Sequence, residues 1–359
     1  MAADDIVSTI ARALELAPIV DGHNDWPWER RLGHESSVEG LEGPLPGHTD
    51  IVRLRRGYVG AQLWSVFVED EGRGTDAVAE TLEQIDLVHR MVEAYPDDLV
   101  LARSAADVEA ARASGRIASL LGAEGAHSIA DSPAVLRMLA ALGVRYLTLT
   151  HNRNSAWADS ATDEPVHGGL TERGRGYIRE LNRLGMLVDL SHVAPTTMHA
   201  ALDVTTAPVI FSHSSCRALN DHPRNVPDDV LTRLDGNGGV IMLTFVPQFL
   251  HAAYMEWDRA GRPGAAPEVP LSVLADHVEH ARAVAGVRHI GLGGDFDGVD
   301  ALPEGITGVD GYPLLLDELA RRGWTAADLA GLAGANVLRV LRATDDAFAG
   351  HRPPTAFVR

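Results

Sequence analysis

The sequence predicts a single-domain (β/α)8 barrel of the TIM type. Eight short apolar runs alternate with helical stretches along the chain, and this alternation is typical of α/β folds with a parallel sheet. Most of the runs are continuously apolar, which indicates strands covered on both faces. Most of them also end at or near a residue that can bind a metal ion or transfer a proton. A closed barrel gathers the carboxyl ends of its strands around one mouth.

The expected strands are the eight apolar runs at Ile19–Asp25, Ala61–Phe67, Ile117–Glu124, Tyr146–His151, Met186–Ser191, Val209–His213, Gly239–Phe245 and His289–Asp295. The helical stretches between them are Asp76–Ala94, Ala105–Ala113, Ala134–Leu142, Thr171–Leu184, Pro195–Leu202, Asp228–Leu234 and Leu271–Val284. In the first of these helices, apolar residues recur every three or four positions. Three of the helices are followed by a glycine, which commonly ends a helix: Gly143, Gly185 and Gly286.

We expect residues 1–359 to form one domain. It has an N-terminal helix at 5–17, a barrel at about 19–300 and C-terminal helices at about 313–342. This length is ordinary for an α/β barrel. The segment Phe249–Pro270 contains several glycines and prolines and predicts a loop. An open doubly wound sheet is the alternative architecture, but no Gly-x-Gly-x-x-Gly motif follows the first strand.

The composition excludes several classes of function. The net charge is −19, which argues against binding to nucleic acid or an anionic membrane surface. All 31 basic residues are arginine, so no lysine can form a Schiff base or bridge two metal ions as a carbamate. Cys216 is the only cysteine, which excludes an internal disulfide and a thiolate metal cluster.

The cellular setting is also predicted from the sequence. The first residues read as an acidic amphipathic helix and not as a signal peptide. No apolar run has the ~20 residues that a membrane span requires. We therefore expect a soluble, cytoplasmic protein. The oligomeric state stays open at this point, a homodimer included.

Five residues at the strand ends are candidate metal ligands. His23 and Asp25 lie two positions apart and should face the same side of their strand. Glu124 ends an apolar run, where a carboxylate needs a partner; the alternative is a structural ion pair with an arginine. His192 and His213 each follow a serine at two successive strand ends. Three imidazoles and two carboxylates suit a pair of zinc ions, with Glu124 as the bridge.

Three further residues are candidates for contact with a substrate. His151 ends the fourth strand, and we expect it to steady an oxyanion; the alternative is a structural histidine. Asp295 follows two glycines at the last strand end, and we expect it to carry a proton. Arg224 lies in a loop before a predicted helix and could hold a carboxylate, although most loop arginines are merely solvated.

Seven segments, in this order, resemble the membrane (renal-type) dipeptidases, and in particular their soluble bacterial relatives. They are IVDGHNDWPW, GAEGAHSI, YLTLTHNRNSAWAD, LVDLSH, VIFSHSSCRAL, HPRNVPDDVL and GLGGDFDGV. The resemblance implies a (β/α)8 barrel with two Zn²⁺ ions per chain. It implies that His23 and Asp25 hold one zinc ion, His192 and His213 hold the other, and Glu124 bridges them.

The same resemblance implies the roles of the remaining residues. His151 and Arg224 would contact the substrate, and Asp295 would shuttle the proton. The expected function is a zinc-dependent dipeptidase that cleaves L,L and also L,D dipeptides with a metal-bridging hydroxide. The alternatives are another amide or lactone hydrolase on the same dinuclear site, and a non-catalytic zinc-binding barrel.

Overall fold

The computed structural model describes residues 3–70 and 72–349 as a closed parallel barrel surrounded by helices. This confirms the predicted TIM-type (β/α)8 fold. The eight barrel strands are β1 (Ile19–Asn24), β2 (Val59–Ser65), β4 (Ile117–Ala123), β5 (Val144–Thr148), β6 (Leu187–Asp189), β7 (Ile210–Ser214), β8 (Val240–Leu243) and β9 (Ile290–Leu292). Each overlaps one of the eight predicted runs. The ends of the expected 1–359 domain lie outside the described residues.

Pairing between the first and last strands closes the barrel. Strand β1 pairs in parallel with β2 on one side and with β9 on the other, where Asp21 stands opposite Leu292. Strand β2 then pairs with β4, and the remaining strands follow in chain order. A ninth strand, β3 (Leu99–Leu101), adds to the start of β4 and was not predicted, because three residues carry too little pattern.

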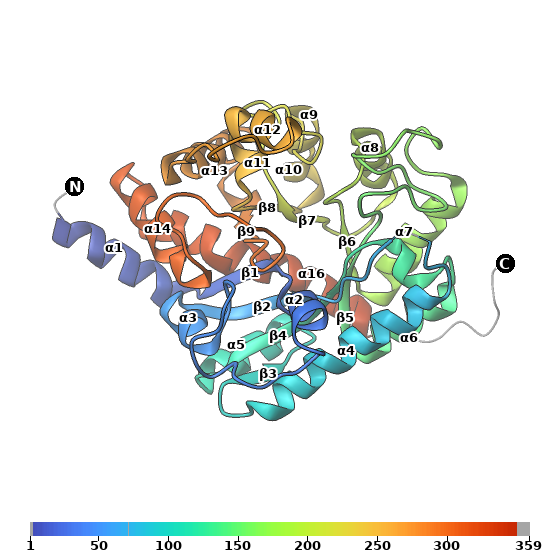
Figure 1. The fold of residues 1–359 in the computed structure, drawn as a ribbon, viewed down its shortest axis with the longest axis horizontal. Coiled ribbons are helices and arrows are strands. Elements are labelled where there is room, and N and C mark those ends of the chain that lie inside the picture. The colour runs from blue at the N-terminus through green and yellow to red at the C-terminus, as the bar shows by residue number, and fades with distance from the viewer. Residues whose placement is uncertain (1–2, 71, 350–359) are drawn as a thin grey trace.

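Helices pack around the ring of strands (Figure 1). In chain order they are α1 (Ala3–Leu16), α2 (Trp26–Gly33), α3 (Ile51–Arg56), α4 (Asp76–Ala94), α5 (Ala105–Ala113), α6 (Pro133–Leu142), α7 (Glu172–Leu184), α8 (Pro195–Val204), α9 (Asp228–Leu231), α10 (Arg233–Asn237), α11 (Pro247–Leu250), α12 (Ala252–Arg259), α13 (Leu271–Ala285), α14 (Tyr312–Arg321), α15 (Ala326–Ala330) and α16 (Asn336–Ala349). Glycines 143 and 185 end α6 and α7 in the left-handed conformation, as the sequence predicts.

The segment Phe249–Pro270 differs from the prediction of a plain loop. It contains the end of α11 and the whole of α12. These helices are short, and the glycines and prolines of the segment 249–270 all follow α12. Helices α2 and α3 were likewise missed, since neither is long enough to show a clear helical period.

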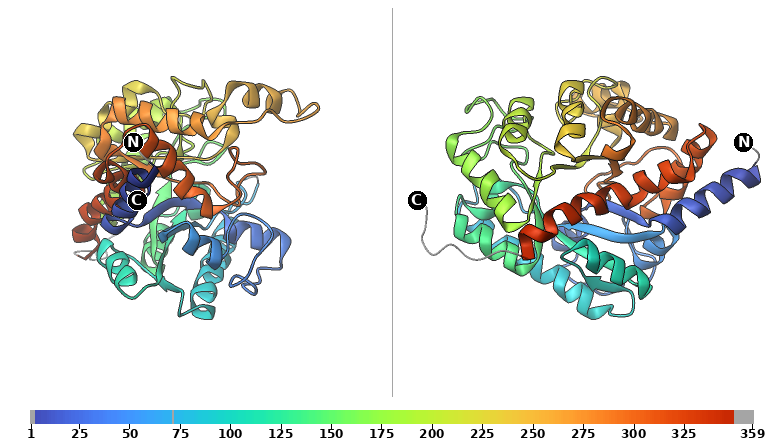
Figure 2. Two further views of the ribbon diagram at one scale, coloured as in Figure 1. Left: turned by 90° about the vertical axis from the view of Figure 1, so that its left-hand side faces the viewer. Right: turned by 180° about the vertical axis from the view of Figure 1, so that it is seen from behind.

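Two apolar cores hold the barrel together. The larger lies mainly between the strands and the outer helices. The smaller fills the barrel interior with side chains such as Leu63, Leu120 and Ile210, and α16 joins it through Val337 and Leu341. Figure 2 shows α16 in red, lying across the strands when the molecule is seen from behind. This helix therefore covers one end of the barrel, and the cavity described below opens at the other.

Within the described residues, no helix is both long and apolar enough to cross a membrane.

Candidate active site

The predicted site residues converge at the carboxyl ends of the barrel strands. A cavity of about 850 Å³ opens there, and seven of the eight predicted residues line it: Asp25, Glu124, His151, His192, His213, Arg224 and Asp295. The eighth, His23, is fully buried, and its Nε2 atom lies 3.5 Å from a carboxylate oxygen of Glu124. Residues separated by more than 270 positions thus share one site, as a closed barrel allows.

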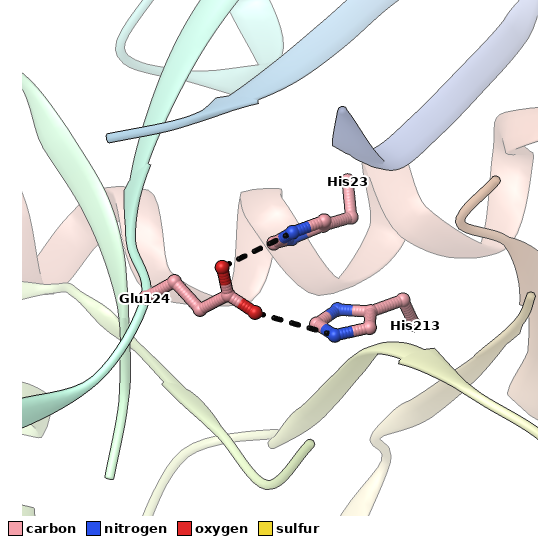
Figure 3. A group of neighbouring side chains, drawn as sticks. All are labelled: His23, Glu124 and His213. Carbon is pink, nitrogen blue, oxygen red and sulfur yellow. Dashed lines mark ion pairs between the residues drawn. The ribbon is translucent and has the colours of Figure 1, made fainter. Parts of the chain in front are cut away.

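Glu124 lies between two groups of imidazoles, and each of its oxygens faces a different group. Oε1 lies 2.9 Å from Nε2 of His192 and 3.4 Å from Nε2 of His213. Oε2 lies near His23 and accepts a hydrogen bond from Ser65 at 3.2 Å. Figure 3 shows this carboxylate between His23 and His213. The alternative of an arginine-paired structural glutamate has no support among the described contacts.

A second cluster forms around His23. Its Nε2 atom lies 3.3 Å from Oδ2 of Asp25 and 3.9 Å from Oδ1 of Asp295. Asp25 is the N-cap residue of α2 and not, as expected, the last residue of the strand. The strand ends one residue earlier, but the carboxylate still meets the imidazole.

The electrostatics of these groups favour a bound cation. Burial above all, together with the Arg224 charge, lowers the pKa values of His192 and His213 well below the ordinary value, so both imidazoles are neutral. Burial alone would raise the pKa of Glu124, but the surrounding histidines lower it well below its usual range. Neutral imidazoles and an ionised carboxylate are the forms that bind metal ions.

His23 and Asp295 respond differently to the same surroundings. Burial would lower the pKa of His23, but the nearby Tyr146, Glu124 and Asp25 raise it well above its ordinary value. Burial raises the pKa of Asp295 to about 8, although the neighbouring His23 opposes the shift. The cluster therefore concentrates negative charge that only protons or a cation can compensate.

A glycine in β4 makes the His23 position possible. A side chain at Gly122 would meet the ring of Tyr146 at 1.9 Å, so the ring occupies the space that a Cβ atom would fill. The hydroxyl of Tyr146 then reaches Nδ1 of His23 at 2.9 Å across the barrel. This contact leaves Nε2 as the nitrogen that faces Glu124 and Asp25.

His151 lies three residues beyond the end of β5, in a loop and not in the strand as predicted. Its ring lies 4.4 Å from that of His192 and 4.5 Å from that of Phe67, measured between centroids. Its Nδ1 atom lies 3.6 Å from a carboxylate oxygen of Asp70. The ring is thus part of the cavity wall, beside the cluster around Glu124.

Arg224 is only 3% exposed, so it is not a solvated loop arginine. Nη2 donates a hydrogen bond to the His213 carbonyl at 3.2 Å, and the guanidinium lies 5.1 Å from the centre of the Phe249 ring. Nη1 is buried without a hydrogen-bond partner. A buried cation with a free donor at the cavity wall is suited to an anionic group of a ligand.

The backbone is strained where the chain turns into the mouth. His192, Asp295 and Asp297 have φ values of 68°, 60° and 64°, which non-glycine residues seldom adopt. Such conformations persist where the surrounding structure fixes them, and they concentrate at functional sites. Asp297 accepts a hydrogen bond from the His48 backbone at 2.6 Å, so it supports a loop, whereas Asp295 faces His23.

Several residues of the site were not singled out from the sequence. Asp70 follows the second strand in an acidic stretch with no distinctive spacing. Tyr146 reads as an ordinary apolar strand residue. Asp189 had a usable signal, because it precedes the first Ser-His pair by two positions in a run that is otherwise apolar.

Comparison with known proteins places the chain in a family. The pattern of the membrane dipeptidase family (peptidase family M19) matches residues 7–352. An uncharacterized dipeptidase of Schizosaccharomyces pombe is 44% identical over 354 residues, covering 94% of this chain and 83% of the relative. The dipeptidase verJ of Clonostachys rogersoniana is 42% identical over 356 residues, covering 96% of this chain and 88% of the relative.

Solved structures of other proteins are also similar to this chain. A metallo peptidase from Rhodobacter sphaeroides, liganded with a phosphinate mimic of the dipeptide L-Ala-D-Ala, has a TM-score of 0.81 and 25% identity, covering 91% of this chain and 99% of that one. The probable dipeptidase PvdM from Pseudomonas aeruginosa has a TM-score of 0.84 at 22% identity, covering 96% and 100%, and supports the fold alone. The chain therefore belongs to the membrane dipeptidase family, peptidase family M19, and is a hydrolase of peptide bonds.

Proposed function

We propose that the chain is a zinc-dependent dipeptidase with two metal ions per chain. One observation carries this proposal: the two oxygens of Glu124 face two separate groups of ligand atoms, one with His192 and His213 and the other with His23. A carboxylate in this position is suited to bridge two cations. With no lysine in the chain, it is also the residue best placed to do so.

The residues present fit such a pair of ions. Nε2 of His23 and Oδ1 of Asp25 are buried without a hydrogen-bond partner. The Nε2 atoms of His192 and His213 lie 3.0 Å apart, although both rings are neutral. Buried polar atoms without partners are costly, and a cation beside His23 and Asp25 would satisfy both of their unpartnered atoms. His23 and Asp25 would hold one ion, His192 and His213 the other, and Glu124 both.

A metal centre held by these residues would supply Lewis-acid polarisation of the peptide carbonyl and would lower the pKa of a water molecule toward neutral pH. The remaining steps belong to the protein. Asp295, at the cavity wall and 3.9 Å from His23, takes the proton of the attacking water and delivers it to the leaving amine. His151, which also lines the cavity, donates a hydrogen bond to the oxyanion. Arg224 holds the terminal carboxylate of the substrate.

The anchoring by Arg224 would select the peptide bond next to a free C-terminal carboxylate. A carboxylate bound at this buried guanidinium would leave the preceding peptide bond in the same cavity as Glu124. The R. sphaeroides relative, with its bound mimic of L-Ala-D-Ala, supports a D residue at the second position. We propose that this chain likewise accepts both L,L and L,D dipeptides.

Metal analysis combined with a dipeptide panel tests the proposal. We expect two zinc ions per chain and hydrolysis of L,L and L,D dipeptides, with little cleavage of tripeptides. Full activity after complete removal of divalent ions would refute the metal-dependent chemistry. Two bound zinc ions without turnover of any dipeptide would favour a non-catalytic zinc-binding barrel.

A further inference from the structure

A buried chain of hydrogen bonds leads from Asp189 through Ser212 to Nδ1 of His213, one of the candidate metal ligands. Ser212 Oγ lies 2.8 Å from Nδ1 of His213 and 2.7 Å from Oδ2 of Asp189. All three residues are at most 1% exposed. The sequence has Ser-His at two successive strand ends, but the pattern alone does not indicate what the two serines do. The structure gives the second serine a partner on each side.

The direction of this chain can be worked out from the donors around Asp189. Its Oδ1 atom accepts hydrogen bonds from the backbone N–H groups of Ser191 and Ser212, at 3.1 and 2.9 Å. Its Oδ2 atom accepts from the hydroxyls of Thr148 and Ser212, at 2.6 and 2.7 Å. Burial raises the pKa of Asp189, but all four neighbours act as donors that lower it and so favour an ionised carboxylate, which has no proton to give.

The single hydroxyl proton of Ser212 is therefore committed to Asp189. The contact between Ser212 Oγ and Nδ1 of His213 then requires that the imidazole supply the proton. A neutral imidazole with its proton on Nδ1 has a free lone pair on Nε2. Nε2 is the atom that faces Glu124 at 3.4 Å and His192 at 3.0 Å.

We propose that Asp189 is a positioning residue that acts through Ser212 to keep the proton of His213 on Nδ1, so that Nε2 is free to bind a metal ion. This inference rests on the proposed function, since it presumes a cation beside Nε2. Asp189 touches neither that cation nor a substrate. Partners that orient a metal-binding histidine in this way typically change metal affinity by 10- to 100-fold.

The substitution Asp189→Asn tests the direction of the chain. The two backbone N–H groups can only donate, so they hold the amide oxygen at the Oδ1 position. The amide NH₂ group then faces the hydroxyls of Thr148 and Ser212. Ser212 must accept from it and turn its own proton toward Nδ1 of His213. The imidazole proton moves to Nε2 and blocks the metal-binding lone pair, although side-chain size has hardly changed.

Ser212→Ala and Thr148→Val complete the set of variants. Ser212→Ala removes the relay without reversing it, so neither tautomer is favoured by a partner. Thr148→Val is the matched control, because it removes a hydrogen bond to Asp189 at nearly constant volume and leaves Ser212 in place. Urea unfolding of each variant checks that the fold is retained.

Two measurements read out the effect. Titration of the metal-free proteins with Zn²⁺ against a chromophoric chelator should show one site weakened 10- to 100-fold in Asp189→Asn, less in Ser212→Ala and less than threefold in Thr148→Val. Long-range ¹H–¹⁵N correlation of the histidine rings in metal-free protein, assigned with His213→Gln, should show Nδ1–H in the unsubstituted protein and Nε2–H in Asp189→Asn.

The outcomes separate this inference from the proposed function. An Nε2–H tautomer in the unsubstituted protein, or unchanged zinc affinity in a folded Asp189→Asn variant, would overturn the inference. If the unsubstituted protein binds no zinc, the proposed function fails. In that case, a His213 proton that moves from Nδ1 to Nε2 in Asp189→Asn would still support the hydrogen-bond relay from Asp189 through Ser212 to His213.

Discussion

Replacing Arg224 should abolish the preference for a free terminal carboxylate. The guanidinium is buried, Nη1 has no partner, and no other arginine shares these two features among the cavity-lining residues that the structure describes. A hydrogen bond to a charged group is worth about 1.5–3 kcal/mol. At 1.4 kcal/mol per factor of ten, its loss lowers kcat/KM by roughly 10- to 150-fold. Arg224→Met keeps most of the side-chain length and removes the charge.

The assay compares a dipeptide with its C-terminal amide. The unsubstituted enzyme should favour the free carboxylate by about the factor calculated above, and Arg224→Met should treat both substrates alike. Arg217→Met is the matched control: Arg217 lies in the same loop, but its guanidinium donates to the Pro223 carbonyl and does not line the cavity. If Arg224→Met still favours the free carboxylate, the anchor has been assigned to the wrong residue.

Three further predictions concern the metal ions, packing and pH. Glu124→Gln should reduce bound zinc from two ions to at most one and abolish hydrolysis, as measured by elemental analysis and turnover. Gly122→Ala should destabilise the protein by about 1–3 kcal/mol in urea unfolding, because its Cβ meets the Tyr146 ring. Burial lowers the pKa of His277 from 6.5 to about 4, although its hydrogen bond to the Leu250 carbonyl opposes the shift. The neutral His277 imidazole therefore contributes fully to stability above pH 6.5. Roughly 3 kcal/mol of the free energy of unfolding is lost as the pH falls to 4.

Each of these predictions has a control or a contrary result. Two zinc ions retained by Glu124→Gln would exclude the bridging role. Gly176→Ala, at an open position in α7, should not destabilise the protein, in contrast to Gly122→Ala. His277→Gln should lose less stability than the unsubstituted protein between pH 7 and pH 4 in the absence of metal. An identical pH dependence of unfolding in the two proteins would contradict the burial argument.

Much of the architecture could be predicted because parallel strands leave a strong signal. The run that leads to Glu124 is nearly continuously apolar and ends in a carboxylate, so both the strand and the point where it ends could be predicted. The end of the first strand was less clear. Asp25 reaches His23 from a helix N-cap, and no single-sequence pattern separates this geometry from a longer strand. Strand β3 and helix α12 are too short for their periods to be visible.

Contacts between side chains on different barrel strands could not be predicted from the sequence. The contact of Tyr146 with His23 depends on the stagger between strands and on the absence of a side chain at Gly122. Asp189 meets Thr148 and Ser212 because β6 lies between β5 and β7, with Asp189 opposite Thr148 on one side and opposite Ile210, two residues before Ser212, on the other. The register between strands that are distant in the sequence follows from closure of the barrel, and no local stretch of sequence encodes that register.

Closure of the barrel by β1 against β9 also has a consequence for biosynthesis. His23 leaves the ribosome long before Asp295, although the two side chains lie 3.9 Å apart in the finished protein. A nascent chain that stops short of β9 has an unsealed ring and lacks α16 at its base. The site should accordingly assemble only after β9 has been synthesised, and forms of the protein that stop short of β9 should be inert rather than partly active.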